Sequence, residues 1–440
     1  MSEYADICIK NLSLFSFRNY LNSDIVSLIF SKKDLAITPN YKTDLEEEDS
    51  EEYTRYIYKT TIKNAKERLD AQGFSISNFE KMFNKNLLQA VDYSGFLYNL
   101  GIDIEDRDEI ALERCKKRVT FRKWQNAMKK IVSYELEHGN IRWRSTTFPL
   151  DIRTECEKII YYSLKDTDSE SYYGIFTEFV DIAFIFRLIL ESCNESDDII
   201  LDFSYLQYWA EDCIPKAISA ADEVEKIIVL VEGTSDKDIL DFAITRIYPH
   251  LSDLFYFMDF DNAKGAKRDG GTSFVVKNLK TFYFSKLKSK FIAIFDNDAE
   301  GYYSKCELMH EIKNWPDNFR ILLYPDIKLF NKYPTIAPNG SIVLDDISKR
   351  ACSIELYLPD NLIKDDTSYS PIEWESRKKI KNENGYTEFL YQGVISQKDE
   401  IKERFHKLRK EIENGERAFN FDEWERMKQL LDTIVFAFKK

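Results

Sequence analysis

Short apolar runs alternate with helical patterns from about residue 222 onward, and this alternation constrains the fold most. The expected strands are 226–231, 254–260, 291–295 and 319–324. Segments with helical character fill the gaps, at about 235–247, 272–287 and 300–313. Apolar strands that alternate with helices are typical of a parallel sheet covered by helices on both faces. The sequence therefore predicts an α/β region with a Rossmann-like parallel sheet and flanking helices.

The part of the chain before this region has a different character. Two strand-like runs, 6–17 and 24–30, open it, and 77–91 has helical spacing. The basic stretch 116–132 fits an amphipathic helix or a strand leading into one, and 153–192 fits a long helical segment. We expect a mixed α+β, largely helical N-terminal domain (1–220) that has a regulatory or docking role. An α/β domain (221–360) and a helical C-terminal extension (361–440) follow it.

Acidic residues follow directly on two of the expected strands. Glu232 comes after the first strand, and Asp296 and Asp298 come after the third. Ligands of open parallel sheets gather at the carboxyl ends of the strands, so these three carboxylates converge if the two strands are neighbours. Asp236, at the entry of the next helix, can face the same place. Helix capping explains one acid per turn, but it does not explain the whole cluster.

The composition of this acidic cluster indicates which metal it would bind. Carboxylates without histidine or cysteine suit Mg²⁺ or Mn²⁺, and such ions commonly meet phosphate oxygens. We therefore expect one or two of these ions. Gly233 and Gly301 beside the acids allow tight turns. None of the seven cysteines forms a C-x-x-C pair and the four histidines are scattered, so neither a zinc site nor a disulfide framework is expected.

The distribution of charge bears on the substrate. A net charge of −14 is unlike that of a protein that coats nucleic acid. Eight Lys or Arg residues and one acid nevertheless lie between Lys264 and Lys290. Within this stretch, Lys264, Lys267 and Arg268 belong to a Gly-containing loop. We expect them to hold substrate phosphates without reading sequence, and a plain surface turn is the alternative.

Two short motifs resemble a known signature. "VEGTSD", followed some sixty residues later by "DNDAEG", is similar to the E-G-x-x-D and D-x-D-x-x-G pair of Toprim domains, found in topoisomerases, primases, recombination proteins and OLD-family nucleases. The resemblance implies a Toprim fold, with Glu232, Asp296 and Asp298 as the metal-binding or general-base carboxylates. Glu355 in "SIELY" is a candidate for a second metal, and Lys398 in "ISQKDEI" for stabilising the transition state. A surface glutamate and a solvated lysine are the alternatives for these two.

A second resemblance covers most of the chain. "YPTIAPNG", "RACSIELYLP", "YQGVISQKDEIKERF" and the N-terminal "SFRNYLNSDIVSLIFSKKDL" are similar to bacterial proteins with a HEPN/Toprim-associated N-terminal domain. HEPN RNase chemistry is not implied, since a HEPN site needs an Arg followed after four to six residues by His. The nearest approach here, "RIYPH", has only three residues between them.

The resemblances imply an Mg²⁺- or Mn²⁺-dependent endonuclease that serves as a toxic effector of bacterial antiphage defence. DNA is the expected substrate, with RNA, including transfer RNA, as the rival. No Walker A motif is visible, so ATP dependence would come from a partner protein. A homodimer is a further expectation. Two alternatives stay open, which are a non-catalytic Toprim subunit that binds nucleic acid and a hydrolase of nucleotides or other small phosphates.

The apolar segments of the chain bear on its location. The most membrane-like run, 174–190, contains Glu178, Asp181 and Arg187, which predicts a buried amphipathic helix and not a membrane span. The first ten residues carry acids and lack the apolar stretch of a signal peptide. We therefore expect a cytoplasmic protein without membrane association.

Overall fold

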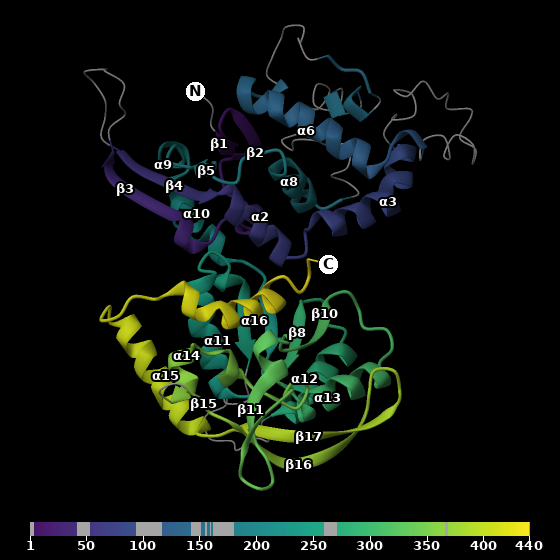
Figure 1. Cartoon of the computed structure of the whole chain (residues 1–440). Helices are drawn as coiled ribbons and strands as arrows, with labels where there is room; N and C mark the ends of the chain where they lie inside the picture. Colours follow the sequence, from purple (N-terminus) through teal and green to yellow (C-terminus); the bar gives the residue numbers. More distant parts are fainter. Residues whose placement is uncertain are drawn as a thin grey trace. The chain divides into compact units, whose positions relative to one another are not determined.

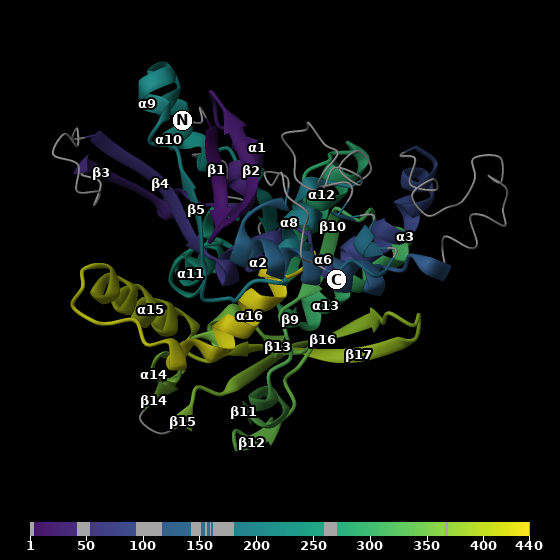
Figure 2. The same cartoon turned by 90° about the horizontal axis from the view of Figure 1, so that it is seen from above.

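The computed structural model describes residues 4–41, 53–93, 117–141, 151–154, 156–158, 160–161, 180–258, 271–365 and 368–439. The chain forms two compact units, one of residues 1–224 with 439–440 and one of residues 225–438. Figure 1 and Figure 2 show the elements of each unit from two directions. Each unit has its own sheet or sheets and its own covering helices, so the two are described separately.

The N-terminal unit is built on a five-stranded antiparallel sheet in the order β2-β1-β5-β4-β3. Its strands are β1 (Tyr4–Ile9), β2 (Leu12–Arg18), β3 (Leu35–Tyr41), β4 (Tyr53–Thr61) and β5 (Asp198–Asp202). The central strand β5 comes from the end of the unit and pairs on both sides with strands from its beginning. The sheet therefore cannot be completed until nearly the whole unit has been assembled.

Helices accompany this sheet. They are α1 (Ser23–Ile29), α2 (Ile62–Ala71), α3 (Ile76–Tyr93), α6 (Phe121–His138), α8 (Ile182–Leu190), α9 (Leu206–Trp209) and α10 (Ile214–Ser219). The helices predicted around 77–91 and within 116–132 are confirmed by α3 and α6. Of the long helical segment expected over 153–192, α8 confirms the end. Thr61 and Thr120 cap α2 and α6 by accepting hydrogen bonds from backbone N–H groups of the first turn.

The strand expected over 24–30 is wrong, because these residues form α1. The Asn22 side chain caps the helix by accepting the backbone N–H of Asp24 at 2.9 Å. The buried residues Ile25, Val26 and Ile29 lie on one face at helical spacing. A short apolar run fits either a buried strand or a helix, and here the cap decides for the helix.

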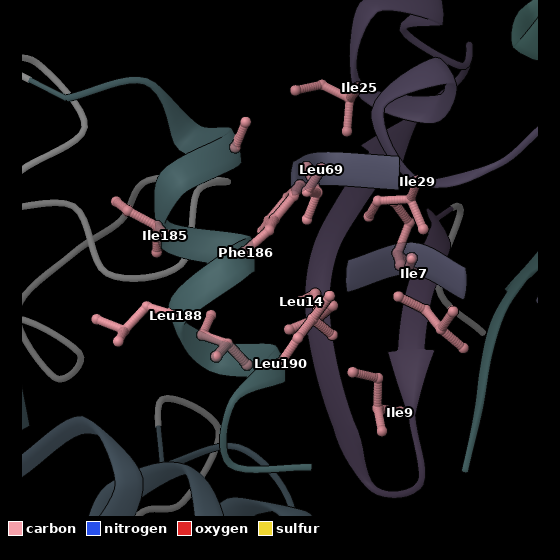
Figure 3. Close-up of a cluster of buried hydrophobic side chains, with 14 of the residues drawn as sticks. Ile7, Ile9, Leu14, Ile25, Ile29, Leu69, Ile185, Phe186, Leu188 and Leu190 are labelled. Atoms are coloured by element: carbon pink, nitrogen blue, oxygen red, sulfur yellow. The ribbon is translucent and has the colours of Figure 1, made fainter. Parts of the chain in front are cut away.

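The core of this unit joins segments that are far apart in the sequence. Phe186 and Leu190 of α8, Leu14 of β2 and Leu69 of α2 belong to one buried cluster (Figure 3). Every residue of α8 from Ala183 to Leu190 is buried. The prediction of a buried helix is thus confirmed for the described end of the apolar run. In the parts of the chain that the structure covers, no helix combines the length and the apolar character needed to cross a membrane.

The second unit contains the expected parallel sheet, in the order β10-β8-β6-β7. Its strands are β6 (Ile227–Leu230), β7 (Phe255–Met258), β8 (Phe291–Phe295) and β10 (Phe319–Leu323), and its helices are α11 (Thr234–Ile247), α12 (Thr272–Phe284) and α13 (Ala299–Glu311). All seven predicted elements are confirmed. All five residues of β8 are buried, as a central strand covered on both faces requires. The fold of this unit is mixed α/β with a parallel sheet.

A second sheet of this unit has the order β12-β11-β16-β17. Its strands are β11 (Tyr333–Ile336), β12 (Ile342–Asp345), β16 (Ile372–Lys381) and β17 (Thr387–Ile395). Two pairs of short strands accompany it, β9 (Asn297–Asp298) with β13 (Ala351–Cys352) and β14 (Lys364–Asp365) with β15 (Ser368–Tyr369). The chain then ends in helices, α15 (Lys398–Glu413) and α16 (Glu425–Val435), and α14 (Asp360–Ile363) precedes β14.

The expectation of a helical extension over 361–440 is therefore wrong in its first half. Residues 372–395 form a long antiparallel hairpin, in which exposed residues alternate with covered ones along β17. That period of two is typical of a strand with one face in solvent. The helices α15 and α16 confirm the expectation for the second half. They pack through buried residues such as Phe405 and Leu431.

Candidate active site

The acidic cluster begins where β6 and β8 end. These strands are neighbours in parallel register, with Val229 opposite Ile292 and Leu230 opposite Ala293. Glu232 lies two residues beyond β6, and Asp296 lies directly after β8. The backbone N–H of Asp296 donates a hydrogen bond to Glu232 Oε1 at 3.0 Å. The motifs "VEGTSD" and "DNDAEG" therefore meet at the carboxyl ends of adjacent strands.

Asp298 is held by three elements. It precedes α13 and caps it, since its Oδ1 accepts the backbone N–H of Gly301 at 2.7 Å. Its other oxygen, Oδ2, accepts a hydrogen bond of 2.6 Å from Nε2 of Gln392 on β17. Its backbone pairs with Ala351 of β13. Capping thus accounts for one oxygen of Asp298, and the long hairpin holds the other.

Gly301 allows the turn between β8 and α13 to close tightly. A Cβ atom at this position would lie 2.1 Å from the carbonyl oxygen of Asp296, far inside contact distance. Only glycine therefore fits here. The glycine of the D-x-D-x-x-G pattern brings the first turn of α13 against Asp296, and it thereby fixes the positions of Asp296 and Asp298 relative to one another.

A second group of charges surrounds Glu355, which lies on a short 3₁₀ turn (Ile354–Tyr357) and is 1% exposed. The Ser353 hydroxyl donates to it at 2.6 Å. Two lysines of α15 also approach it, Lys398 at 3.5 Å and Lys402 at 3.7 Å between nitrogen and oxygen. Glu355 is thus a buried ion-pair partner and not the surface residue considered as the alternative.

Asp236 lies in the first turn of α11 and is buried. Burial, followed by the negative charge of Glu355, raises its pKa to about 7. The Tyr324 hydroxyl donates to its Oδ1 at 3.5 Å. Lys398 interacts electrostatically with Asp236, Asp296 and Glu355. Burial opposes its charged form, but these carboxylates prevail and raise the pKa of Lys398 to about 12, so the lysine keeps its proton.

The pKa values of the acids at the strand ends are all raised. Burial, followed by the charge of Asp298, raises the pKa of Glu232 to about 8. Burial and then Glu232 raise that of Asp296 well above its usual range, with Asp236 and Asp298 adding to the effect. Burial also raises the pKa of Asp298. These carboxylates repel one another in a place where little water screens them.

One atom of this cluster lacks a partner. Asp296 Oδ1 is buried and accepts no hydrogen bond from any residue that the structure describes. An unpartnered oxygen among mutually repelling carboxylates fits a divalent cation, and the donors are hard oxygens of the kind that Mg²⁺ and Mn²⁺ prefer. The side chains do not form a closed ligand set, however. Within the described ranges, no three His, Cys, Asp or Glu residues are grouped so as to hold a metal ion.

The predicted residues thus fall into two sets. Glu232, Asp236, Asp296, Asp298, Glu355 and Lys398 are linked by the hydrogen bonds, ion pairs and electrostatic interactions given above. Lys264, Lys267 and Arg268, expected to hold substrate phosphates, lie outside the described residues. The expectation for the loop therefore stays a prediction.

Sequence reasoning missed four residues that contact the cluster. Gln392 holds Asp298 and accepts the backbone N–H of Glu300 at 3.1 Å. Lys378 of β16 forms an ion pair with the Glu300 side chain. Lys402 and Tyr324 contact Glu355 and Asp236. The one available signal was the spacing of Lys398 and Lys402, one helical turn apart, which places both on the same face of α15.

Comparisons with known proteins bear on the N-terminal half of the chain. A family model described as HEPN/Toprim N-terminal domain 1 matches residues 1–221, half of the chain. No curated protein matches, and no solved structure does. The match covers the N-terminal unit with its five-stranded sheet, and its description associates the chain with HEPN and Toprim proteins, a nuclease-associated group. The chain belongs to the HEPN/Toprim N-terminal domain 1 family.

Proposed function

We propose that this chain is a nuclease that requires Mg²⁺ or Mn²⁺ and hydrolyses phosphodiester bonds in nucleic acid. DNA is the favoured substrate and RNA the rival. One observation carries the proposal, namely that Glu232 and Asp296 touch at the ends of adjacent parallel strands, beside Asp298, with raised pKa values. The Toprim-like motifs and the family match support the same conclusion. The motifs favour a Toprim fold for the unit of residues 225–438.

The residues of the cluster would have different roles. Glu232, Asp296 and Asp298 would hold one or two divalent ions, with help from Asp236 and Glu355. A divalent ion, when bound, supplies Lewis-acid activation of water and neutralises charge on the phosphate. Gln392 keeps Asp298 in place by its hydrogen bond of 2.6 Å. Gly301 lets α13 approach Asp296 closely, which keeps the two aspartates in a fixed relation.

Lys398 would contribute positive charge next to the carboxylates. It interacts with Asp296 and keeps its proton, because Glu355 and the other acids raise its pKa to about 12. A fixed cation beside the site can stabilise the negative charge that develops on a phosphate during cleavage. Lys264, Lys267 and Arg268 would hold substrate phosphates without reading sequence. The biological role would be that of a toxic effector in antiphage defence, with a partner such as an ATPase as its trigger.

The experiment is incubation of the purified protein with Mg²⁺ or Mn²⁺ and, separately, with supercoiled plasmid and total bacterial RNA. Asp296→Ala serves as the inactive variant, and circular dichroism confirms that it is folded. Nicked plasmid or discrete RNA fragments that the variant does not produce would support the proposal and show which nucleic acid is the substrate. Equal cleavage by the variant would overturn the assignment of Asp296.

A second candidate is a non-catalytic subunit that binds nucleic acid through the same fold. It is favoured by one finding, that several acids are already engaged by protein groups. Asp298 is bound by Gln392 and Gly301, and Glu355 by two lysines. Binding of nucleic acid without cleavage under every metal condition, together with unchanged binding by Asp296→Ala, would favour this candidate.

A further inference from the structure

The hairpin of β16 and β17 presents two chemically different faces. The two strands run side by side as one long hairpin (Figure 1, Figure 2). Arg377 lies opposite Tyr391 and Lys379 opposite Phe389, whereas Lys378 lies opposite Leu390. Because side chains alternate along a strand, Lys378 and Leu390 point to the face opposite to that of Arg377 and Tyr391. We call these the inner and the outer face.

The inner face covers the acidic cluster. Lys378 pairs with Glu300, and Gln392 donates to Asp298. Further along the hairpin, Ile380 and Leu390 belong to a small apolar cluster with residues of α13, namely Ala299, Tyr302 and Cys306. This face is therefore occupied by the packing of the unit itself, and it ties the position of the hairpin to the candidate active site.

The outer face carries a row of aromatic rings and guanidinium groups. Phe389 is 52% exposed and Tyr391 47% exposed. The guanidinium of Arg377 lies 4.6 Å from the ring centre of Phe389 and 5.7 Å from that of Tyr391. Trp374 continues the row, with its ring centre 6.2 Å from that of Tyr391 and with Arg350 stacked on it at 4.2 Å. A contiguous row of exposed rings is typical of surfaces that bind a ligand or a partner.

A groove lies at the Trp374 and Tyr391 end of this row. It has a volume of about 680 Å³, and its lining includes Trp374, Arg377 and Tyr391 of the hairpin together with Ile336 and Pro338. A planar group that entered the groove would meet the two aromatic rings. Two glutamates, Glu373 and Glu375, also line it, so the groove itself does not suit phosphate. It suits the uncharged, aromatic part of a ligand.

Phosphate would find its partners on β16, along the rest of the outer face. Lys379 and Lys381, like Arg377 at the edge of the groove, are exposed and project from this strand. In the part of the chain that the structure covers, none of the three forms an ion pair with a carboxylate. The chain as a whole has a net charge of −14, so this basic strand is a local exception. Aromatic rings flanked by cations that form no ion pair with a described carboxylate complement a ligand that carries both bases and phosphates.

We propose that the outer face of the β16–β17 hairpin is a stacking platform for a single-stranded segment of DNA. The proposal rests on the nuclease function proposed above and extends it to the form of the substrate. Bases in a duplex are already stacked on one another, so only unpaired bases can lie on Phe389, Tyr391 and Trp374. β17 is an edge strand, and the same strand carries Gln392, which contacts Asp298. The platform and the candidate active site therefore lie on the two faces of one hairpin, and a bound single strand would have to pass the edge of β17 to reach the acids.

The test measures binding by fluorescence anisotropy of a labelled oligo(dT) in EDTA, where no cleavage takes place. The variant is the double substitution Phe389→Ala with Tyr391→Ala. Phe421→Ala is the matched control, since Phe421 is a similarly exposed ring in another part of the same unit (62%). We expect the double variant to bind roughly ten-fold or more weakly and the control to bind like the native protein. A duplex of the same length should compete poorly.

A second variant, Lys379→Gln with Lys381→Gln, tests the charged end of the platform. It should weaken binding and reduce the dependence of binding on salt. Equal binding by native protein and the aromatic variant would overturn the proposal, as would binding of RNA with none of DNA. Protein self-association that Tyr391→Ala abolishes, without oligonucleotide binding, would instead identify the face as a contact between copies. All variants replace exposed residues, and melting temperatures verify that they fold.

The two proposals fail in different ways. Binding to the platform without any cleavage in Mg²⁺ or Mn²⁺ would reject the nuclease function and keep the platform. Cleavage that depends on Asp296 but not on Phe389 or Tyr391, and no binding of oligo(dT), would reject the platform and keep the nuclease.

Discussion

The backbone N–H of Asp296 donates a hydrogen bond of 3.0 Å to the Glu232 carboxylate. This contact links the ends of β6 and β8, which are sixty-four residues apart at these positions. It also leaves the two carboxylates close together, with Asp298 and Asp236 near enough to raise their pKa values further. Such repulsion among buried carboxylates costs stability, and a divalent cation bound between them would offset it.

Replacing Asp296 by Asn should stabilise the protein and abolish the proposed nuclease activity. The substitution keeps the shape of the side chain and removes a carboxyl group whose charged form is opposed by burial and by three neighbouring carboxylates. We expect a gain of about 1–2 kcal/mol, which is a rise of roughly 2–8 °C in melting temperature for a unit of this size. Calorimetry in EDTA measures the gain, and plasmid cleavage measures the loss.

The response of this variant to metal is a further part of the same test. Mg²⁺ should raise the melting temperature of the native protein, because an ion that binds only the folded state stabilises it. It should have much less effect on Asp296→Asn. A variant that is less stable than the native protein in EDTA would contradict the repulsion described here.

Stability without metal should fall as the pH rises. In the folded chain the pKa of Glu232 is about 8 and that of Asp236 about 7, both above the ordinary values of 4.5 and 3.8. The folded state therefore binds more protons than the unfolded state between about pH 4 and pH 8, so the free energy of unfolding decreases with pH across this window. Melting temperatures in EDTA from about pH 5 to pH 8 measure the slope. The double variant Glu232→Gln with Asp236→Asn should show a flatter curve, and an upward slope in the native protein would refute the prediction.

Gly301→Ala should damage both the fold and the site. The added Cβ would lie 2.1 Å from the carbonyl oxygen of Asp296, and a backbone atom cannot move aside as a flexible side chain can. We expect a loss of about 3 kcal/mol or more, because α13 must shift away from β8. Glu307→Ala on the exposed surface of α13 is the control and should change stability by less than about 0.5 kcal/mol. Denaturant unfolding compares the two, and similar losses would show that the close approach is unimportant.

The parallel sheet could be predicted from the sequence because its strands are short, apolar throughout and separated by helical patterns. The position of Glu232 beside Asp296 then followed from a general property of such sheets. The single failure among the short apolar runs was α1, where the side chain of Asn22 outweighed the β-like composition of residues 24–30.

The hairpin of β16 and β17 could not be predicted in the same way. β16 contains six charged residues among ten, and one of its faces lies in solvent, so it lacks an apolar run. Gln392 reaches Asp298 from 94 residues away, and nothing local in "YQGV" marks it as part of the site. Residues that close a site from a distant strand act through tertiary packing, which propensity and periodicity do not report.

The buried ion pairs of Glu355 should respond unequally to the loss of either partner. Glu355 is 1% exposed, whereas the side chain of Lys402 is 28% exposed. Lys402→Met takes a cation from a buried carboxylate and should cost about 1–3 kcal/mol. Glu355→Gln leaves lysines that water can reach and should cost less than about 1 kcal/mol. Chemical denaturation of both variants, with the exposed Lys407→Met as control, tests this order, and a larger loss for Glu355→Gln would reverse the interpretation.

The family-matched unit contains its own buried charge pair, whose removal should be costly. Arg187 Nε lies 2.7 Å from Asp70 Oδ1, and both side chains are less than one-tenth exposed, at 8% and 4%. Arg187→Met would leave Asp70 buried with Lys439 as its remaining partner, and we expect a loss of about 3–5 kcal/mol. Combining it with Asp70→Leu should restore part of that stability, because no buried charge then remains unpaired. Lys63→Met, which removes an exposed pair with Glu67, is the control and should have almost no effect. A double variant that is no more stable than Arg187→Met alone would contradict this reasoning. It would mean that Arg187 and Asp70 stabilise the core by their packing and not by their charges.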